Sequence, residues 1–130
     1  MIVTDASVLY TALAEGGTVG RRFRRRLSGE ELAAPDIVDV EVTSVLRRHV
    51  RAGIVDHPRA EEILGDLREL PINRIAARQL IPRCWELRDN VTVCDALYIA
   101  LAEALGCTLV TADTKLANGH GSRCRIELLR

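Results

Sequence analysis

The chain has 130 residues, of which 48% are hydrophobic and only 3% aromatic, and its 18 Lys and Arg balance 18 Asp and Glu. A chain of this length buries roughly two-thirds of the surface that its unfolded form exposes, which is enough for one domain with its own core. We therefore expect a single domain over residues 1–130, and the composition excludes an intrinsically disordered protein. The zero net charge excludes the diffuse positive field of a non-specific polyanion binder.

The cysteines and the apolar runs indicate where the protein resides. No C-x-x-C pair is present among Cys84, Cys94, Cys107 and Cys124, so the spacing does not favour a zinc site. Three of the four lie inside apolar runs, which favours buried free thiols in a reducing compartment. No run approaches the roughly 18 apolar residues of a membrane span, and the opening MIVTDAS lacks the pattern of a signal peptide. We expect a cytoplasmic protein that does not enter a membrane.

The predicted elements alternate along the first half of the chain. Residues 2–4 form a β-branched run that predicts a short strand, and the residues after Asp5 carry apolar side chains at helical spacing. A second, surface helix is predicted over 18–27. A weak strand over 32–34 then precedes a long helix over 36–52. This half therefore predicts two strands, each followed by helix.

The second half continues this alternation. A helix is predicted to begin at Asp56, and residues 92–105 are apolar nearly all round, so we expect a buried helix there. The other elements expected here are a strand over 71–75, a helix over 76–88, and strands over 107–111 and 125–129.

Short strands separated by helices predict an α/β fold, with a short, mostly parallel β-sheet flanked by helices on both faces. In such sheets, ligands bind beyond the carboxyl ends of the strands. Asp5 and Asp113 each follow a predicted strand. We therefore expect their carboxylates to lie at the same edge of the sheet.

Two further acids, Glu41 and Asp95, stand in the apolar stripes of predicted helices. Glu41 is four residues from both Ile37 and Val45, and Asp95 comes three residues before Tyr98. A buried carboxylate protonates, pairs with a cation or binds a metal, because an unpaired charge is costly to bury. No Lys or Arg occupies these stripes one turn away. A shared divalent cation would satisfy all four acids.

Each acid also has an interpretation without catalysis. Asp5 could cap the helix that begins at Ala6, and Asp113 could cap a turn over 114–118. Thr92 and Asp95 match a capping box, and Glu41 could meet an Arg from elsewhere. The joint arrangement favours a shared site, because two acids end neighbouring strands and two face inward from helices that must pack on the sheet.

Hard oxygen ligands select Mg²⁺, and Mn²⁺ can replace it. Such an ion lowers the pKa of a bound water and offsets charge on a leaving oxygen, which suits phosphodiester hydrolysis. Ser7 and Thr111, each two residues from an acid, could orient a carboxylate or a water. They could equally be ordinary polar residues of a turn and a strand.

The ordered set of motifs resembles the PIN-domain ribonucleases, and among them the VapC-type toxins of bacterial toxin–antitoxin pairs. The resemblance rests on IVTDASVLYTAL, DIVDVEVTSVLRR, TVCDALYIALAEALG and TLVTADTKLA, and it covers essentially the whole chain. It implies a metal-dependent endoribonuclease with a PIN-like fold. It further implies that Asp5 and Asp95 are the first candidates for direct Mg²⁺ ligands and that Asp113 is the next. Glu41 would act through water or position the nucleophile. Some members have a further acid after the last Asp, where this chain has Asn118.

The resemblance also implies partners. These are a second copy of the chain in a homodimer, a cognate VapB-type antitoxin that fills the acidic groove, and a structured RNA substrate such as transfer RNA. Sequence-specific proteins usually read RNA at unpaired loops, where the bases can be unstacked.

A dense basic segment surrounds Phe23 and consists of Arg21, Arg22, Arg24, Arg25 and Arg26. Its charge density is sufficient to bind RNA phosphates. An acidic stretch of the antitoxin could dock there instead, and a solvated helix face is the third interpretation.

Two other functions fit parts of the pattern. A receiver-like phosphoacceptor domain has similar length and topology, with a Lys near its last acid as Lys115 follows Asp113, but it requires paired acids where Asp5 stands alone. A PIN domain that only binds RNA is the second alternative, and the presence of all four acids disfavours it.

Overall fold

A computed structural model describes residues 1–130, and its centre is one five-stranded sheet in the order β3-β2-β1-β4-β5. The strands are β1 (Ile2–Thr4), β2 (Leu32–Pro35), β3 (Ile72–Ile75), β4 (Thr108–Thr111) and β5 (Ile126–Leu128). All four neighbouring pairs are parallel. The α/β prediction is confirmed, and β1 lies between β2 and β4 in the middle of the sheet.

The strands are short apolar runs because both faces of the sheet are covered. Every residue of β1 and β2 is buried, and β4 is buried after its first residue. A parallel sheet covered on both faces leaves no position for an alternating polar side chain. The edge strands β3 and β5 are partly exposed.

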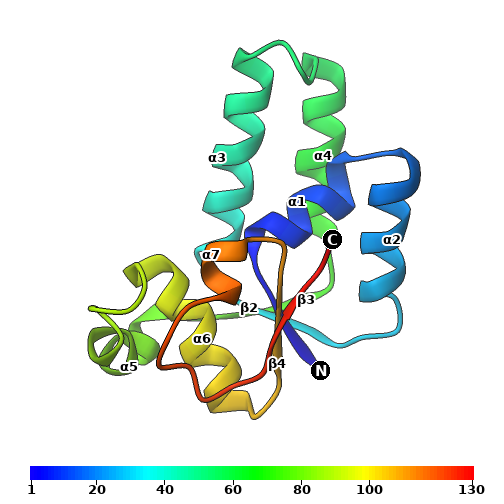
Figure 1. The fold of residues 1–130 in the computed structure, drawn as a ribbon. Coiled ribbons are helices and arrows are strands. Elements are labelled where there is room, and N and C mark those ends of the chain that lie inside the picture. Colours follow the sequence, from blue (N-terminus) through cyan, green and yellow to red (C-terminus); the bar gives the residue numbers. More distant parts are fainter.

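Helices cover both faces of the sheet, with α1 and α2 on one face and α5 and α6 on the other (Figure 1). The α3 and α4 helices form a hairpin that extends beyond the carboxyl ends of the strands (Figure 1). The helices are α1 (Ala6–Ala14), α2 (Gly17–Leu27), α3 (Val38–Arg51), α4 (His57–Glu69), α5 (Ile81–Glu86), α6 (Val93–Leu105) and α7 (Thr114–Ala117). None of these helices combines the length and the hydrophobicity that a membrane-spanning segment requires.

The prediction of one continuous helix over 76–88 is wrong. A 3₁₀ turn, η1 (Ala77–Leu80), precedes α5, which ends at Glu86. Pro82 lies in the first turn of α5, where its missing N–H is tolerated, and inside a longer helix it would remove a hydrogen bond. The residues after Glu86 form turns that lead to α6.

The central helix of the fold is α6, as its composition predicts. Residues 96–102 are buried without interruption, and the helix packs against β1, β2 and β4. Thr92 caps its first turn, and Gly106 ends it in the left-handed conformation with φ of 63°. Because Asp95 lies in the first turn, α6 presents this carboxylate near the carboxyl ends of the strands.

Candidate active site

Asp5 is the most buried of the four predicted acids, with 5% of its surface exposed. It follows β1 and caps α1, and its Oδ1 accepts hydrogen bonds from the backbone N–H of Val8 (3.1 Å) and from Ser7 Oγ (2.6 Å). Its Oδ2 accepts a hydrogen bond from Thr111 Oγ1 at 2.5 Å. Asp5 therefore does cap α1, through the bond from Val8, but its other two hydrogen bonds come from the hydroxyl groups of Ser7 and Thr111.

These two hydroxyl groups join the ends of β1 and β4. Ser7 Oγ accepts a hydrogen bond from the N–H of Ala112 (3.0 Å), and Thr111 Oγ1 accepts one from the N–H of Asp113 (3.0 Å). Each hydroxyl thus donates to Asp5 and accepts from the segment that follows β4. This arrangement fixes the orientation of the Asp5 carboxylate relative to Asp113.

Glu41 reaches the site from the first turn of α3. Its Oε1 accepts a hydrogen bond of 2.5 Å from the hydroxyl of Tyr98 on α6, a side chain that is only 2% exposed. No Arg pairs with Glu41. Two residues earlier on the same helix, both carboxylate oxygens of Asp39 accept hydrogen bonds from Arg74, from Nε at 2.7 Å and from Nη2 at 3.0 Å. The neighbouring acid of α3 is thus neutralised, whereas Glu41 keeps its charge unpaired.

Asp95 and Asp113 both lie at helix starts, where Thr92 caps α6 and Asp113 caps α7. The backbone N–H of Asp95 donates to Thr92 Oγ1 at 3.2 Å, and Asp113 Oδ1 accepts from the N–H of Lys115 at 2.8 Å. These contacts position both acids at helix starts. Neither carboxylate forms an ion pair.

The four carboxylates repel one another. Burial raises the pKa of Asp5, Glu41 and Asp95 above the ordinary range. The charge of Asp113 further raises the pKa of both Asp5 and Asp95, and the charges of Asp5 and Asp95 raise that of Glu41. The side chains from β1, α3, α6 and the end of β4 therefore form one electrostatic cluster without an internal cation.

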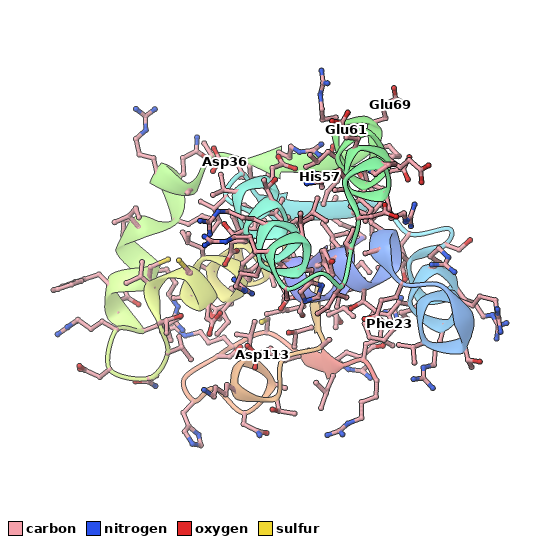
Figure 2. The ribbon with its side chains drawn as sticks, turned by 90° about the horizontal axis from the view of Figure 1, so that it is seen from above. Phe23, Asp36, His57, Glu61, Glu69 and Asp113 are labelled. Carbon is pink, nitrogen blue, oxygen red and sulfur yellow. The ribbon has the colours of Figure 1, made fainter.

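Figure 2 looks down on this end of the sheet, with Asp113 at the start of α7. The acids of α4, such as Glu61 and Glu69, lie apart from it on the other side of α3 (Figure 2). They do not belong to the cluster.

The donor set fits a hard divalent cation. No three His, Cys, Asp or Glu side chains converge closely enough to hold a metal ion by themselves. Mg²⁺ usually keeps several waters and takes only one or two carboxylates. Asp5 uses three of about four lone-pair positions on its carboxylate, so one stays available.

Two groups at the site escaped sequence reasoning. The Tyr98 hydroxyl orients Glu41. The signal in the sequence was a single phenol within the apolar run 96–102, since a buried Tyr usually finds a partner for its hydroxyl. Thr4 directly precedes Asp5, is fully buried, and carries a hydroxyl oxygen without a hydrogen-bond partner. No sequence signal marks an unpartnered hydroxyl.

The basic segment on α2 divides into two groups. Arg24 donates to the carbonyls of Ala12 (3.0 Å) and Glu15 (2.7 Å), so it stabilises the end of α1. Arg26 forms a bidentate pair with Glu127 of β5 at 2.8 and 2.9 Å. Arg21, Arg22 and Arg25 are exposed and pair with no acid, and Arg24 is exposed as well although it binds the carbonyls of Ala12 and Glu15.

The sequence matches known proteins over nearly its whole length. Residues 2–119 match the family model of the PIN domain. The VapC ribonuclease Mb0985 of Mycobacterium bovis is 40% identical over 132 residues, which covers 99% of this chain and 98% of the relative. Ribonuclease VapC12 of Mycobacterium tuberculosis is 36% identical over 129 residues, covering 99% of each chain.

Solved structures show the same fold. PAE2754 from Pyrobaculum aerophilum has a TM-score of 0.69 at 25% identity, covering 96% of this chain and 81% of that one. VapC20 of Mycobacterium tuberculosis, a toxin that cleaves the sarcin-ricin loop, has a TM-score of 0.67 at 17% identity, covering 89% and 92%. With this fold, and with sequence identity over the full length, the chain belongs to the PIN-domain family and, within it, to the VapC ribonucleases.

Proposed function

We propose that this ribonuclease is a Mg²⁺-dependent endoribonuclease toxin that hydrolyses phosphodiester bonds in structured RNA such as transfer RNA. Asp5, Asp95 and Asp113 would hold Mg²⁺ or Mn²⁺, and Glu41 would contact it through water or position the nucleophile. The observation that carries the proposal is a cluster of four inward carboxylates, mutually repelling and without ion pairs, at the carboxyl ends of β1 and β4. A bound cation would remove that repulsion.

The chemistry divides between the cation and the chain. When bound, the cation lowers the pKa of a coordinated water and offsets charge on the leaving oxygen. Ser7 and Thr111 hold the Asp5 carboxylate in one orientation, and Tyr98 does the same for Glu41. Neutral hydroxyl donors orient these groups without pairing their charge, so the carboxylates remain anionic ligands.

The relatives support the remaining parts of the proposal. VapC20 acts on the sarcin-ricin loop, a structured RNA, and the toxin family implies a cognate antitoxin. We propose that this chain forms a homodimer, acts in the cytoplasm and is inhibited by a VapB-type antitoxin.

The test is cleavage of unfractionated transfer RNA by the purified protein with Mg²⁺, with Mn²⁺ or with excess EDTA. We expect cleavage only with a divalent cation, and none by Asp5→Asn or Asp95→Asn. Asp66→Asn is the matched control, because Asp66 is an exposed acid of α4 and should keep full activity. Circular dichroism verifies that each variant is folded.

Undiminished cleavage in EDTA, or full activity of both site variants, would refute the proposal. The catalytically inert alternative instead expects transfer RNA to be bound and left intact under every condition. Membership of the VapC ribonucleases excludes the receiver-like alternative.

A further inference from the structure

A surface hollow of about 460 Å³ adjoins the candidate active site at Asp95. The turn that follows α5 forms one wall, and α7 contributes the other through Lys115. The lining residues are Arg88, Asp89, Asn90, Val91, Thr92, Asp95 and Lys115. Because Asp95 belongs to both places, a polymer that crosses the acidic cluster can enter this hollow without leaving the surface.

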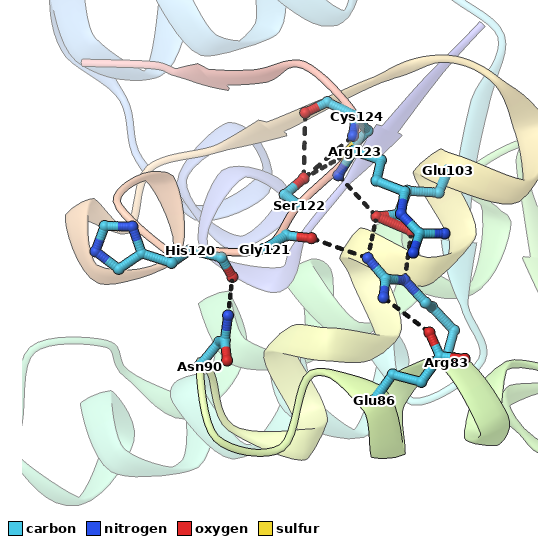
Figure 3. Close-up of polar contacts among 9 residues, drawn as sticks. All are labelled: Arg83, Glu86, Asn90, Glu103, His120, Gly121, Ser122, Arg123 and Cys124. Carbon is cyan, nitrogen blue, oxygen red and sulfur yellow. Dashed lines mark hydrogen bonds and ion pairs between the residues drawn. The ribbon is translucent and has the colours of Figure 1, made fainter.

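The walls of the hollow are tied together. Asn90 Nδ2 donates to the carbonyl of His120 at 2.9 Å, and Arg83 donates to the carbonyl of Gly121 at 2.9 Å (Figure 3). Arg83 is itself anchored by a bidentate pair with Glu103 at 2.8 and 3.0 Å. Gly121 has φ of +87°, and a Cβ there would lie 2.6 Å from Asn90 Nδ2. The loop after α7 is therefore packed against the turn after α5, and the hollow is preformed.

Two cations of the hollow have no anionic partner. Lys115 is the only lysine of the chain, and its ammonium group makes no hydrogen bond or ion pair. Arg88 stacks over the indole of Trp85, with 4.7 Å from its Cζ to the ring centroid, and donates one hydrogen bond to the Trp85 carbonyl at 2.8 Å. A guanidinium has five donors, so Arg88 has donors left for a ligand.

We propose that this hollow binds a backbone phosphate of the RNA, next to the one that is cleaved, through Arg88 and Lys115. The inference rests on the proposed function, because it assigns a subsite to the same substrate. Arginine forms bidentate hydrogen bonds with phosphate, and lysine contributes a mobile point charge. A chain that runs past four carboxylates needs local cations, and a second bound phosphate fixes the register of the scissile bond.

The exposed Trp85 side chain offers a surface to a second copy of the chain, and its fluorescence can report RNA binding. Trp85 is 64% exposed and Ile81, one turn earlier on α5, is 49% exposed, so a second copy of the chain could cover them. Trp85 is also the only tryptophan of the chain. Its emission therefore reports directly on the stacked Arg88, and an RNA phosphate there changes it.

The experiment measures the binding of fluorescently labelled, unfractionated transfer RNA by anisotropy over a range of salt concentrations. The full-length Asp5→Asn protein serves as the parent so that the RNA stays intact. We expect Arg88→Gln and Lys115→Gln each to weaken binding at least about tenfold, which is the lower end of the range for one hydrogen bond to a charged group. Each should also reduce the slope of log affinity against log salt by about 0.7 to 0.9.

Three matched variants control for net charge. Arg68→Gln makes the same charge change on α4 and should bind as the parent does, since Arg68 is exposed and lies outside the hollow. Lys115→Arg keeps the charge and should restore binding. Asp89→Asn removes an exposed, unpaired anion from the hollow and should strengthen binding.

Several results would overturn the subsite. These are affinities of Arg88→Gln and Lys115→Gln within twofold of the parent, losses equal to that of Arg68→Gln, or a parent that does not bind transfer RNA. If the Trp85 emission changes with protein concentration and does not change when RNA is added, this face binds a second copy of the chain and not RNA. Failure of the proposed function is seen separately, because the wild-type protein would then not cleave RNA with Mg²⁺ whatever these binding results show.

Discussion

Two buried threonines at the ends of neighbouring strands allow a matched test of how Asp5 is held. Thr111 on β4 donates to Asp5 Oδ2 and accepts from the N–H of Asp113. Thr4 on β1 is equally inaccessible, yet its hydroxyl oxygen has no partner. Replacement of each by valine removes one hydroxyl and keeps the shape, so the two variants differ only in the hydrogen bonds they lose.

The magnitudes follow from those contacts. A hydrogen bond to a charged group contributes about 1.5–3 kcal/mol, so Thr111→Val should lower the free energy of unfolding by about that amount. In a domain of this size the change corresponds to a fall in Tm of roughly 6–12 °C. Thr4→Val should be neutral or stabilising by up to about 1 kcal/mol, because it removes a buried polar atom that nothing satisfies.

Function should separate the variants as well. Loss of a group that orients a metal ligand typically lowers metal affinity or activity by about 10- to 100-fold, so Thr111→Val should need more Mg²⁺ for cleavage. Thr111→Ser keeps the hydroxyl and should restore the Mg²⁺ dependence. Urea unfolding and Mg²⁺ titration of RNA cleavage measure both effects. Equal stability changes in Thr111→Val and Thr4→Val would refute the reasoning.

Three further outcomes follow from the site. The Tyr98 hydrogen bond lowers the pKa of Glu41, so Tyr98→Phe should move the acid limb of the cleavage profile to higher pH, whereas an unmoved limb would contradict a role for Glu41. Burial raises the pKa of Asp5, so its folded form binds protons more tightly and the stability of the Mg²⁺-free protein falls as pH rises from about 4 through the raised value. Asp5→Asn should flatten that dependence in urea unfolding. Gly121→Ala should lower Tm, because the new Cβ meets Asn90 at positive φ, and an unchanged Tm would show that the loop is loose.

Most of the fold could be predicted because its signals are local. Residues 2–4 and 107–111 are short β-branched runs, and the continuous apolar face of 92–105 requires burial, so strand and helix follow from periodicity alone. The break between η1 and α5 was missed because Pro82 can stand at a helix start as well as interrupt a helix, and the sequence does not say which.

The candidate site was likewise predictable only in part. Asp5 and Asp113 were found from their place after strands, and both are at that edge of the sheet. The partner of Glu41 depends on how α3 crosses α6, and the cations beside Asp95 depend on where the loop after α7 packs. Such contacts arise from tertiary packing between residues distant in sequence, for which one sequence carries no periodic signal.

The way in which acids are partnered separates the ion-paired carboxylates of this protein from those of the candidate site. Asp39, Glu103 and Glu127 each accept two hydrogen bonds from one arginine. Each of these charges is therefore neutralised by a guanidinium from another part of the fold. The cluster around Asp5 has only hydroxyl and backbone donors, which fix direction and leave the charge in place.

That difference has an energetic consequence. Unpaired, mutually repelling carboxylates destabilise the folded chain until a cation binds, and a ligand that binds only the folded state stabilises it by mass action. The proposed Mg²⁺ site would therefore couple stability and catalysis through the same ion. Mg²⁺ should therefore raise the Tm of the wild-type protein and leave that of Asp5→Asn nearly unchanged, even without RNA. An equal Mg²⁺ effect on both proteins would show that the ion binds elsewhere.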